Sequence, residues 1–251
     1  EAAQSFADEI TAEGGVAKAY KCNVLDKAVC YEVADAVEKD FGKCDILVNG
    51  AGGNNPRATT DKEYFEEGDI DADTKSFFDL DASGVEFVFN LNFLGTLIPT
   101  QAFARQMVGR EGCNIINISS MNAYTPLTKI PAYSGAKAAI SNFTQWLAVH
   151  FSKVGIRCNA ICPGNTQTNI GVGMRQPSER GMAKATTGYA GATRSGTPEE
   201  ISAAAVRIQK TAAAVAELDA LVSFAAVAVR NSYCRPDVDE SGVIEIQEGR
   251  H

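Results

Sequence analysis

The sequence predicts an α/β fold with a doubly wound parallel sheet, and two observations lead to this expectation. Short apolar runs that suit buried parallel strands alternate with amphipathic helical stretches, which is the rhythm of successive β-α-β units. The chain has 251 residues, of which 45% are hydrophobic, and can therefore bury one large core. We expect one domain over residues 1–251.

The amino-terminal part predicts a helix, a strand, a second helix and a second strand. In the helices, apolar residues recur at helical spacing among charged ones, and the strands show either alternation or a short apolar run. Glycines follow both helices, as is common at helix ends. The four expected elements span residues 1–13, 16–22, 29–41 and 45–48.

A long polar segment follows the second strand. Residues 53–84 are rich in Asn, Asp and Gly and are expected to form an insertion before the helix that carries Asn92. Long loops at the carboxyl ends of parallel strands often build substrate sites. We therefore expect this insertion to lie beside the substrate.

The rest of the chain continues the alternation. Its expected strands and helices span residues 114–118, 132–152, 156–161, 203–229 and 241–246. The first of these strands ends at Ser119 and Ser120. Residues 169–197, with Gly and Ser throughout, predict a mobile substrate lid.

Tyr133 and Lys137 stand four residues apart in the predicted helix 132–152 and therefore face the same side of it. An ammonium beside a phenol stabilises the phenolate, and each unit by which the phenol pKa falls corresponds to about 1.36 kcal/mol. We expect Lys137, together with a positively charged nicotinamide, to lower the pKa of Tyr133 towards the range of efficient acid-base catalysis. The pair predicts proton transfer in carbonyl and alcohol redox chemistry. A Tyr and a Lys also occur at this spacing by chance, so the surrounding residues decide.

These surroundings resemble the short-chain dehydrogenase/reductase family at four further places, in the family's order. The matching segments are Asn49–Gly52, Leu91–Gly95, Asn114–Ser120 and Pro163–Thr168. In the family they are the turn after the fourth strand, the helix with a catalytic Asn, the strand that ends in the catalytic Ser, and the segment that meets the nicotinamide. The resemblance implies a Rossmann-like sheet and an NAD- or NADP-dependent oxidoreductase that interconverts a secondary alcohol and a ketone.

The same resemblance implies a role for each site residue. Ser120 binds the substrate oxygen, with Asn122 nearby, and Tyr133 exchanges its proton. Lys137 holds the nicotinamide ribose, and Asn92 positions a water. The further cofactor contacts are Asn23, Val24, Asn49, Gly50, Ala51, Gly52, Pro163, Gly164 and Thr168. Because the family pairs the Asn92 helix and helix 132–152 across a subunit interface, a homo-oligomer is implied, either a dimer or a tetramer.

Three residues are rivals for these roles. Ser119 precedes Ser120, but the thirteen-residue spacing to Tyr133 and the alternation along the strand favour Ser120. Tyr124 lacks a Lys four residues later, and His150 is expected to be a surface or packing residue.

A nearer resemblance concerns the substrate. The segments Gly50–Pro56, Phe77–Asp81 and Ser120–Tyr124 resemble bacterial D-mannonate oxidoreductases of the short-chain type, also called fructuronate reductases, and the similarity runs over about residues 1–170. It implies a sugar acid as the small-molecule substrate, with D-fructuronate reduced to D-mannonate. A carboxylate needs cations or amide donors. The candidates are Arg57, Lys129, Arg175, Asn54 and Asn122.

The family's phosphate-binding turn, Thr-Gly-x-x-x-Gly-x-Gly, does not occur in the sequence. We therefore expect the first β-α-β segment to be missing from these residues. Two explanations stay open: the sequence is a piece of a longer enzyme, or the protein is a truncated relative that serves as a non-catalytic binding protein or scaffold. The residue that would choose NAD or NADP follows the missing second strand.

Composition disfavours several other classes. A net charge of −8 without a cluster of Lys and Arg argues against nucleic acid. The most apolar window, residues 211–229, contains two acidic residues and argues against a membrane helix. Seven scattered cysteines indicate reduced thiols in a cytoplasmic protein and no metal site. A serine hydrolase is disfavoured because there is no Gly-x-Ser-x-Gly.

Overall fold

The computed structural model describes residues 2–164, 203, 204, 206 and 207. The protein splits after Gln209 into two units, and every described residue lies in the first. The predicted lid 169–197, the strand 241–246 and most of the helix 203–229 lie outside the described residues. A single domain over residues 1–251 therefore remains a prediction.

Three parallel strands form a sheet in the order β1-β2-β3. They are β1 (Ile46–Asn49), β2 (Asn114–Ile118) and β3 (Arg157–Ile161). Ile46 pairs with Asn114, and Asn114 pairs with Arg157. The first residues of all three strands are therefore paired with one another, and the strands end at the same side of the sheet. The strands predicted at 45–48, 114–118 and 156–161 are confirmed, and so is the parallel α/β sheet.

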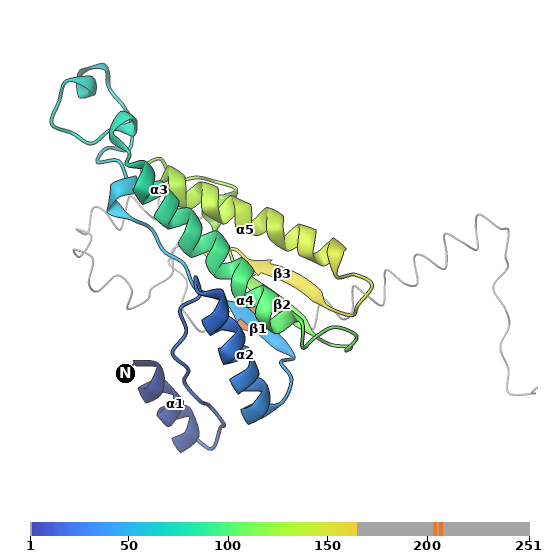
Figure 1. The fold of residues 1–251 in the computed structure, drawn as a ribbon. Coiled ribbons are helices and arrows are strands. Elements are labelled where there is room, and N and C mark those ends of the chain that lie inside the picture. The colour runs from blue at the N-terminus through green and yellow to red at the C-terminus, as the bar shows by residue number, and fades with distance from the viewer. Residues whose placement is uncertain (1, 165–202, 205, 208–251) are drawn as a thin grey trace, which may run out of the picture. The chain divides into compact units, whose positions relative to one another are not determined.

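Helices α4 (Gly95–Ala104) and α5 (Pro131–His150) pack on one face of this sheet, and α2 (Lys27–Phe41) packs beside α4 (Figure 1). The residues buried between the sheet and these helices are mostly aliphatic or sulfur-containing. They are Ala104, Met107, Cys113, Ile115, Leu147, Ile156 and Cys158. Full burial of an aliphatic or Met side chain contributes about 1.5–3 kcal/mol, so this cluster is the main source of cohesion between helices and sheet.

Local signals set the ends of the first two helices. The side chain of Asp26 accepts a hydrogen bond from the amide of Val29 at 3.2 Å, so α2 begins at Lys27, slightly earlier than expected. Gly42 follows α2 with φ of 85°, a conformation that favours glycine. Helix α1 (Ala2–Ala12) confirms the predicted first helix.

The strand predicted over residues 16–22 is wrong. These residues have no regular structure, and among the described residues they find no neighbouring strand to pair with. Their side chains instead bind α2: the Tyr20 hydroxyl donates to the carboxylate of Asp40 at 2.5 Å, and Lys18 forms an ion pair with the same group. Alternation predicts a strand only where a partner supplies the backbone hydrogen bonds.

Strand β1 is covered on one face rather than on both, as far as the described residues go. Leu47 packs against the buried cluster under α4 and α5, whereas Ile46 and Val48 are 42% and 54% exposed. The two faces differ because successive side chains point to opposite sides of a strand.

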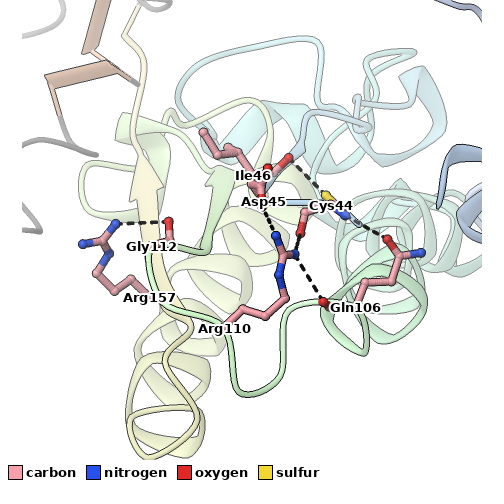
Figure 2. A network of polar contacts seen from close by, with 7 residues as sticks. All are labelled: Cys44, Asp45, Ile46, Gln106, Arg110, Gly112 and Arg157. Atoms are coloured by element: carbon pink, nitrogen blue, oxygen red, sulfur yellow. Dashed lines mark hydrogen bonds and ion pairs between the residues drawn. The ribbon is translucent and has the colours of Figure 1, made fainter. Parts of the chain in front are cut away.

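A polar network joins the amino-terminal ends of the strands to the segment that follows α4 (Figure 2). Arg110 donates to the carbonyl of Cys44 at 3.0 Å and forms an ion pair with Asp45, just before β1. Gln106 accepts from the amide of Cys44 at 3.0 Å and donates to the carbonyl of Ala34 in α2 at 2.9 Å. Side-chain contacts therefore fix the amino-terminal ends of the strands, whereas the candidate active site lies at their carboxyl ends.

The insertion 53–84 contains three short 3₁₀ turns and no strand. The amide of Thr60 donates to the carbonyl of Lys129 at 3.0 Å, which ties the insertion to the segment before Tyr133. Asp81 then caps α3 (Ala82–Phe89), accepting from the amide of Ser83. The insertion thus lies beside the loop that leads to Tyr133, and its expected place beside the substrate remains a prediction. Within the described residues, no helix has the length and apolar character needed to cross a bilayer.

Candidate active site

The carboxyl ends of the three strands lie at the same edge of the sheet, and the loops after β2 and β3 are joined there. The amide of Ser119 donates to the carbonyl of Ile161 at 2.8 Å, and the amide of Met121 donates to that of Pro163 at 3.0 Å. Ligands of open parallel sheets bind at this edge. The segment Pro163–Gly164 is thereby held against the turn that carries Ser120.

Ser119 and Ser120 point to different partners. The hydroxyl of Ser119 donates to the carbonyl of Lys137 at 3.0 Å and lies 2.7 Å from the hydroxyl of Ser141, so it fastens the end of β2 to α5. The hydroxyl of Ser120 accepts from the amide of Asn122 at 3.2 Å and lies close enough to the phenol of Tyr133 to act on its pKa. The structure therefore brings Ser120, and not Ser119, to Tyr133, as the alternation along the strand predicted.

Tyr133 lies in the first turn of α5, which Pro131 begins. Burial raises the pKa of its phenol above the ordinary value, and the hydrogen bond with Ser120 partly opposes that rise. The sequence predicts a pKa lowered by Lys137 together with a positively charged nicotinamide. In the protein without the nicotinamide, desolvation of the phenol outweighs the favourable interactions.

Lys137 is buried, with 4% of its surface exposed. Its ammonium donates to the carbonyl of Ile118 at 2.8 Å and lies 5.6 Å from the ring centre of Tyr133. Burial lowers the pKa of Lys137 to about 8, while Cys162 favours the charged form. The hydrogen bond to the end of β2 thus fixes the position of the Lys137 ammonium, in addition to the spacing of Lys137 from Tyr133.

Asn92 is fully buried in a π-helical turn (Asn90–Leu94) between α3 and α4. Its side-chain amide donates to the carbonyls of Gly53 and Val88, both at 2.7 Å, and its oxygen accepts from the amide of Gly53 at 3.3 Å. These contacts fasten the loop after β1 to the helix. The water expected on Asn92 remains a prediction.

Gly52 lies against the side chains of Asn92 and Lys137. A Cβ at this position would be 2.6 Å from the side-chain oxygen of Asn92 and 3.2 Å from the ammonium of Lys137. The loop after β1 can approach these two groups so closely only because residue 52 has no side chain. The predicted residues Gly52, Asn92 and Lys137 therefore converge.

The other expected cofactor contacts lie in three parts of the structure: the turn before α2, the loop after β1 and the segment after β3. Asn23 lies in an exposed turn and accepts from the amide of Leu25, and Val24 packs close to Gly95 of α4. Gly50 and Ala51 belong to the loop after β1, and Gly164 lies near the sulfur of Met121. Thr168 lies outside the described residues.

Asn49 takes part in a buried polar network that sequence reasoning missed. Its amide donates to Thr100 of α4 at 2.9 Å and to Asn117 of β2 at 2.8 Å, and Asn117 in turn donates to Thr144 of α5 at 2.9 Å. Both amide hydrogens of Asn49 are thus used within the protein, which supports a structural role for this predicted cofactor contact. The signal that could have revealed it was an Asn at the end of one apolar strand and an Asn inside the next strand along the chain.

The structure places the rival residues Tyr124 and His150 and the expected substrate residues in different surroundings. Tyr124 is 66% exposed, and His150 stacks on Trp146 at 4.4 Å, which fits the expected packing role. Asn122 is buried beside Ser120. Arg57 is already bound by Ser83 at 3.1 Å and faces Asp81. Arg175 lies outside the described residues.

Three similar proteins place the chain among known sequences. An oxidoreductase of Haemophilus influenzae that has not been characterised is 69% identical over 169 residues, which are 67% of this chain and 59% of that protein. A 3beta-hydroxysteroid dehydrogenase 2 of Eggerthella lenta is 41% identical over 209 residues, which are 82% of this chain and 73% of that protein. A crystal structure from Haemophilus influenza, described as a candidate D-mannonate oxidoreductase with bound NAD, is 56% identical with a TM-score of 0.73. The match covers 82% of this chain and 74% of that protein.

The model of the short chain dehydrogenase family matches residues 1–179. The matched region contains the parallel sheet, Ser120, Tyr133 and Lys137. By this match, and by its identity with the relatives above, the protein belongs to the short-chain dehydrogenase family.

Proposed function

We propose that this protein is an NAD- or NADP-dependent oxidoreductase that interconverts a secondary alcohol and a ketone. One observation carries the proposal: the hydroxyl of Ser120 lies close enough to the phenol of Tyr133 to lower its pKa, and the ammonium of Lys137 lies 5.6 Å from the centre of the same ring. A hydroxyl, a phenol and an ammonium in this arrangement can bind a carbonyl oxygen and exchange a proton with it.

The described residues fit the nicotinamide and ribose half of such a cofactor. Lys137 has three N–H donors, of which Ile118 takes one, and a ribose diol offers suitable acceptors for the others. The bare backbone of Gly52 lies against Lys137, and Pro163–Gly164 flank the same edge. We propose these residues as the cofactor's contacts. NAD is favoured over NADP because the 56% identical structure carries NAD.

In this proposal the protein's own residues handle the proton. The bound cofactor supplies or accepts a hydride at the carbon of the substrate. Ser120 orients the carbonyl oxygen, and Tyr133, whose pKa lies above its ordinary value, stays protonated at neutral pH and donates its proton to that oxygen during reduction. Lys137, with a pKa of about 8, is mainly charged at pH 7 and stabilises the phenolate that remains.

For Asn92 we propose a positioning role. Its amide holds both backbone groups of Gly53, which keeps Gly52 against Lys137, and its own carbonyl accepts from the hydroxyl of Thr96 at 2.9 Å. These contacts support a rigid loop after β1.

We propose a sugar acid, D-fructuronate or D-mannonate, as the substrate. The name of the 56% identical structure supports this assignment. Lys129 is a suitable cation, because it is half-buried in the segment before Tyr133, where its backbone carbonyl accepts from the amide of Thr60 in the insertion. Arg57 is a weaker candidate, since its guanidinium already donates to the hydroxyl of Ser83 and forms an ion pair with Asp81.

Steady-state reduction of D-fructuronate with NADH tests this substrate. We expect Lys129→Gln to raise KM with little change in kcat, because the lysine would bind the carboxylate equally in the ground and transition states. Lys153→Gln, at an exposed position beyond α5, is the matched control and should leave KM unchanged. Equal KM values for both variants would refute the role of Lys129.

A 3β-hydroxysteroid is the second candidate substrate, because the Eggerthella lenta 3beta-hydroxysteroid dehydrogenase 2 is 41% identical over 82% of this chain. Turnover of a 3β-hydroxysteroid, with none of D-fructuronate or D-mannonate, would select it. The third possibility, a non-catalytic binding protein or scaffold, is tested by calorimetric titration with NADH. An enzyme should bind NADH at micromolar concentrations, and a scaffold should release no heat.

We also propose that the protein is a homo-oligomer of the cytoplasm, paired through α4 and α5. An apolar hollow of about 490 Å³ lies along these helices, lined among others by Leu97, Phe143 and Trp146. Trp146 is 53% exposed, which is unusual for so large an apolar side chain. Sedimentation should give a monomer for Trp146→Glu and the native oligomer for Phe41→Glu, an exposed site on α2. The same sedimentation for both variants would refute this interface.

A further inference from the structure

Cys22 and Cys30 are the one pair of sulfurs in contact among the six cysteines that the structure describes. Their Sγ atoms lie 3.8 Å apart. Cys30 is fully buried in α2, against Ala34 and Ala102, whereas Cys22 is half-buried in the irregular segment before the helix. The contact thus joins a fixed thiol to one that solvent reaches.

The surroundings of this pair allow the sulfurs to approach. A disulfide needs a separation of about 2.05 Å, so the sulfurs must close by somewhat less than 2 Å. Cys30 is held by α2, whose first turn is capped by Asp26. Cys22 ends the segment that does not pair as a strand among the described residues. Most of the movement therefore falls on Cys22.

We propose that Cys22 and Cys30 form an oxidant-responsive pair that closes to an intramolecular disulfide when the protein meets a peroxide. The thiolate of Cys22 attacks one oxygen of hydrogen peroxide, which gives a sulfenic acid and releases hydroxide. The sulfur of Cys30 then displaces the sulfenic oxygen, which leaves as water with the thiol proton. The hydroxide takes up the proton that Cys22 lost on ionisation, so that two thiols are oxidised by two electrons and one peroxide is reduced to two waters.

The environments of the two sulfurs assign these roles. Burial, the contact with Cys22 and the nearby charges raise the pKa of Cys30 to about 12, so Cys30 stays a thiol at neutral pH. Its thiol also points to the carbonyl of Asn23 at 3.6 Å. Cys22 is the more accessible sulfur and is therefore the one that meets the peroxide, with Cys30 as the resolving thiol.

The disulfide would also affect the neighbouring turn. Asn23 and Val24 follow Cys22 directly, and Val24 packs close to Gly95 of α4. If these two residues contact the cofactor, which rests on the proposed function, closing the disulfide pulls them out of place. We expect the oxidised protein to bind NADH several-fold more weakly and the reduced protein to regain the affinity.

Peptide mapping of the full-length protein tests the pair. Trypsin separates the two cysteines, because Lys21, Lys27 and Lys39 are cleavage sites, into peptides 22–27 and 28–39. After mild peroxide and alkylation without reductant, we expect these peptides linked, with a mass lower by two hydrogens than their sum. Dithiothreitol should separate them, and Cys22→Ser should leave Cys30 as an alkylated thiol.

Cys44→Ser is the matched control, because Cys44 is also half-buried but its sulfur bonds the carbonyl of Ile46 at 3.3 Å. The link between 22 and 30 should form in this variant as in the wild type. Separate alkylation of both cysteines after peroxide, or over-oxidation of Cys22 without a link, overturns the proposal. Failure of the reduced protein to bind NADH would count against the proposed function only, since the linked peptides decide the pair.

Discussion

Replacing Gly52 by alanine tests whether the loop after β1 is held against Asn92 and Lys137. The added Cβ would lie 2.6 Å from the side-chain oxygen of Asn92 and 3.2 Å from the ammonium of Lys137. Asn92 cannot move freely, because its amide is bonded to Gly53 and Val88. Overpacking of this kind costs about 1–3 kcal/mol.

Gly50→Ala is the matched control in the same loop. A Cβ at Gly50 would find its nearest neighbour, a side-chain carbon of Ile118, at 4.0 Å, and neither Gly50 nor Gly52 has a positive φ. We expect the free energy of unfolding, measured by urea titration, to fall by about 1–3 kcal/mol for Gly52→Ala. The fall for Gly50→Ala should be within about 0.5 kcal/mol. Equal losses for the two variants would refute the close approach.

Three further predictions address the groups around this loop. Lys137 has a pKa of about 8 in the folded protein against 10.5 ordinarily, so between these values the unfolded protein binds a proton at this lysine that the native state lacks, and the contribution of Lys137 to stability rises with pH, against the opposing contribution of the buried thiols Cys30 and Cys158; in urea titrations across this range, the slope of stability against pH should be lower in Lys137→Met than in the wild type. Asn117→Ala leaves the Asn49 amide short of a partner and removes the donor to Thr144, and it should lower the free energy of unfolding by about 1–3 kcal/mol, less in a background that already carries Asn49→Ala. Tyr133→Phe should reduce turnover by at least about 100-fold, whereas Ser119→Ala, whose hydroxyl only fastens β2 to α5, should lower the melting temperature and largely keep kcat; loss of turnover in Ser119→Ala alone would contradict the assignment of the two serines.

Much of the fold follows from local patterns. The apolar runs at 45–48, 114–118 and 156–161 predicted strands, and the regular spacing over 132–152 predicted α5, because burial of one face imposes a period on the sequence. The strand predicted at 16–22 failed for the complementary reason. Its alternation is local, but a strand exists only through hydrogen bonds to a neighbour that the pattern does not contain.

Part of the candidate site was also predictable, because it depends on the same periods. Four residues of helix bring Tyr133 and Lys137 to one side, and alternation at the end of β2 separates Ser119 from Ser120. The direction of the Tyr133 pKa was not predictable, since it is set by how deeply the phenol is buried among residues distant in sequence.

The sequence by itself determined the parallel order of the elements and the placement of Tyr133 and Lys137 on one side of α5, because both follow from spacings along one polypeptide. Only the tertiary structure decided what these residues touch. Lys137 is directed by the carbonyl of Ile118, Asn92 by the backbone of Gly53, and Asn49 by Asn117 in the next strand. Such contacts join segments far apart in the sequence, and their energies depend on distance and burial, which exist only once the protein has folded.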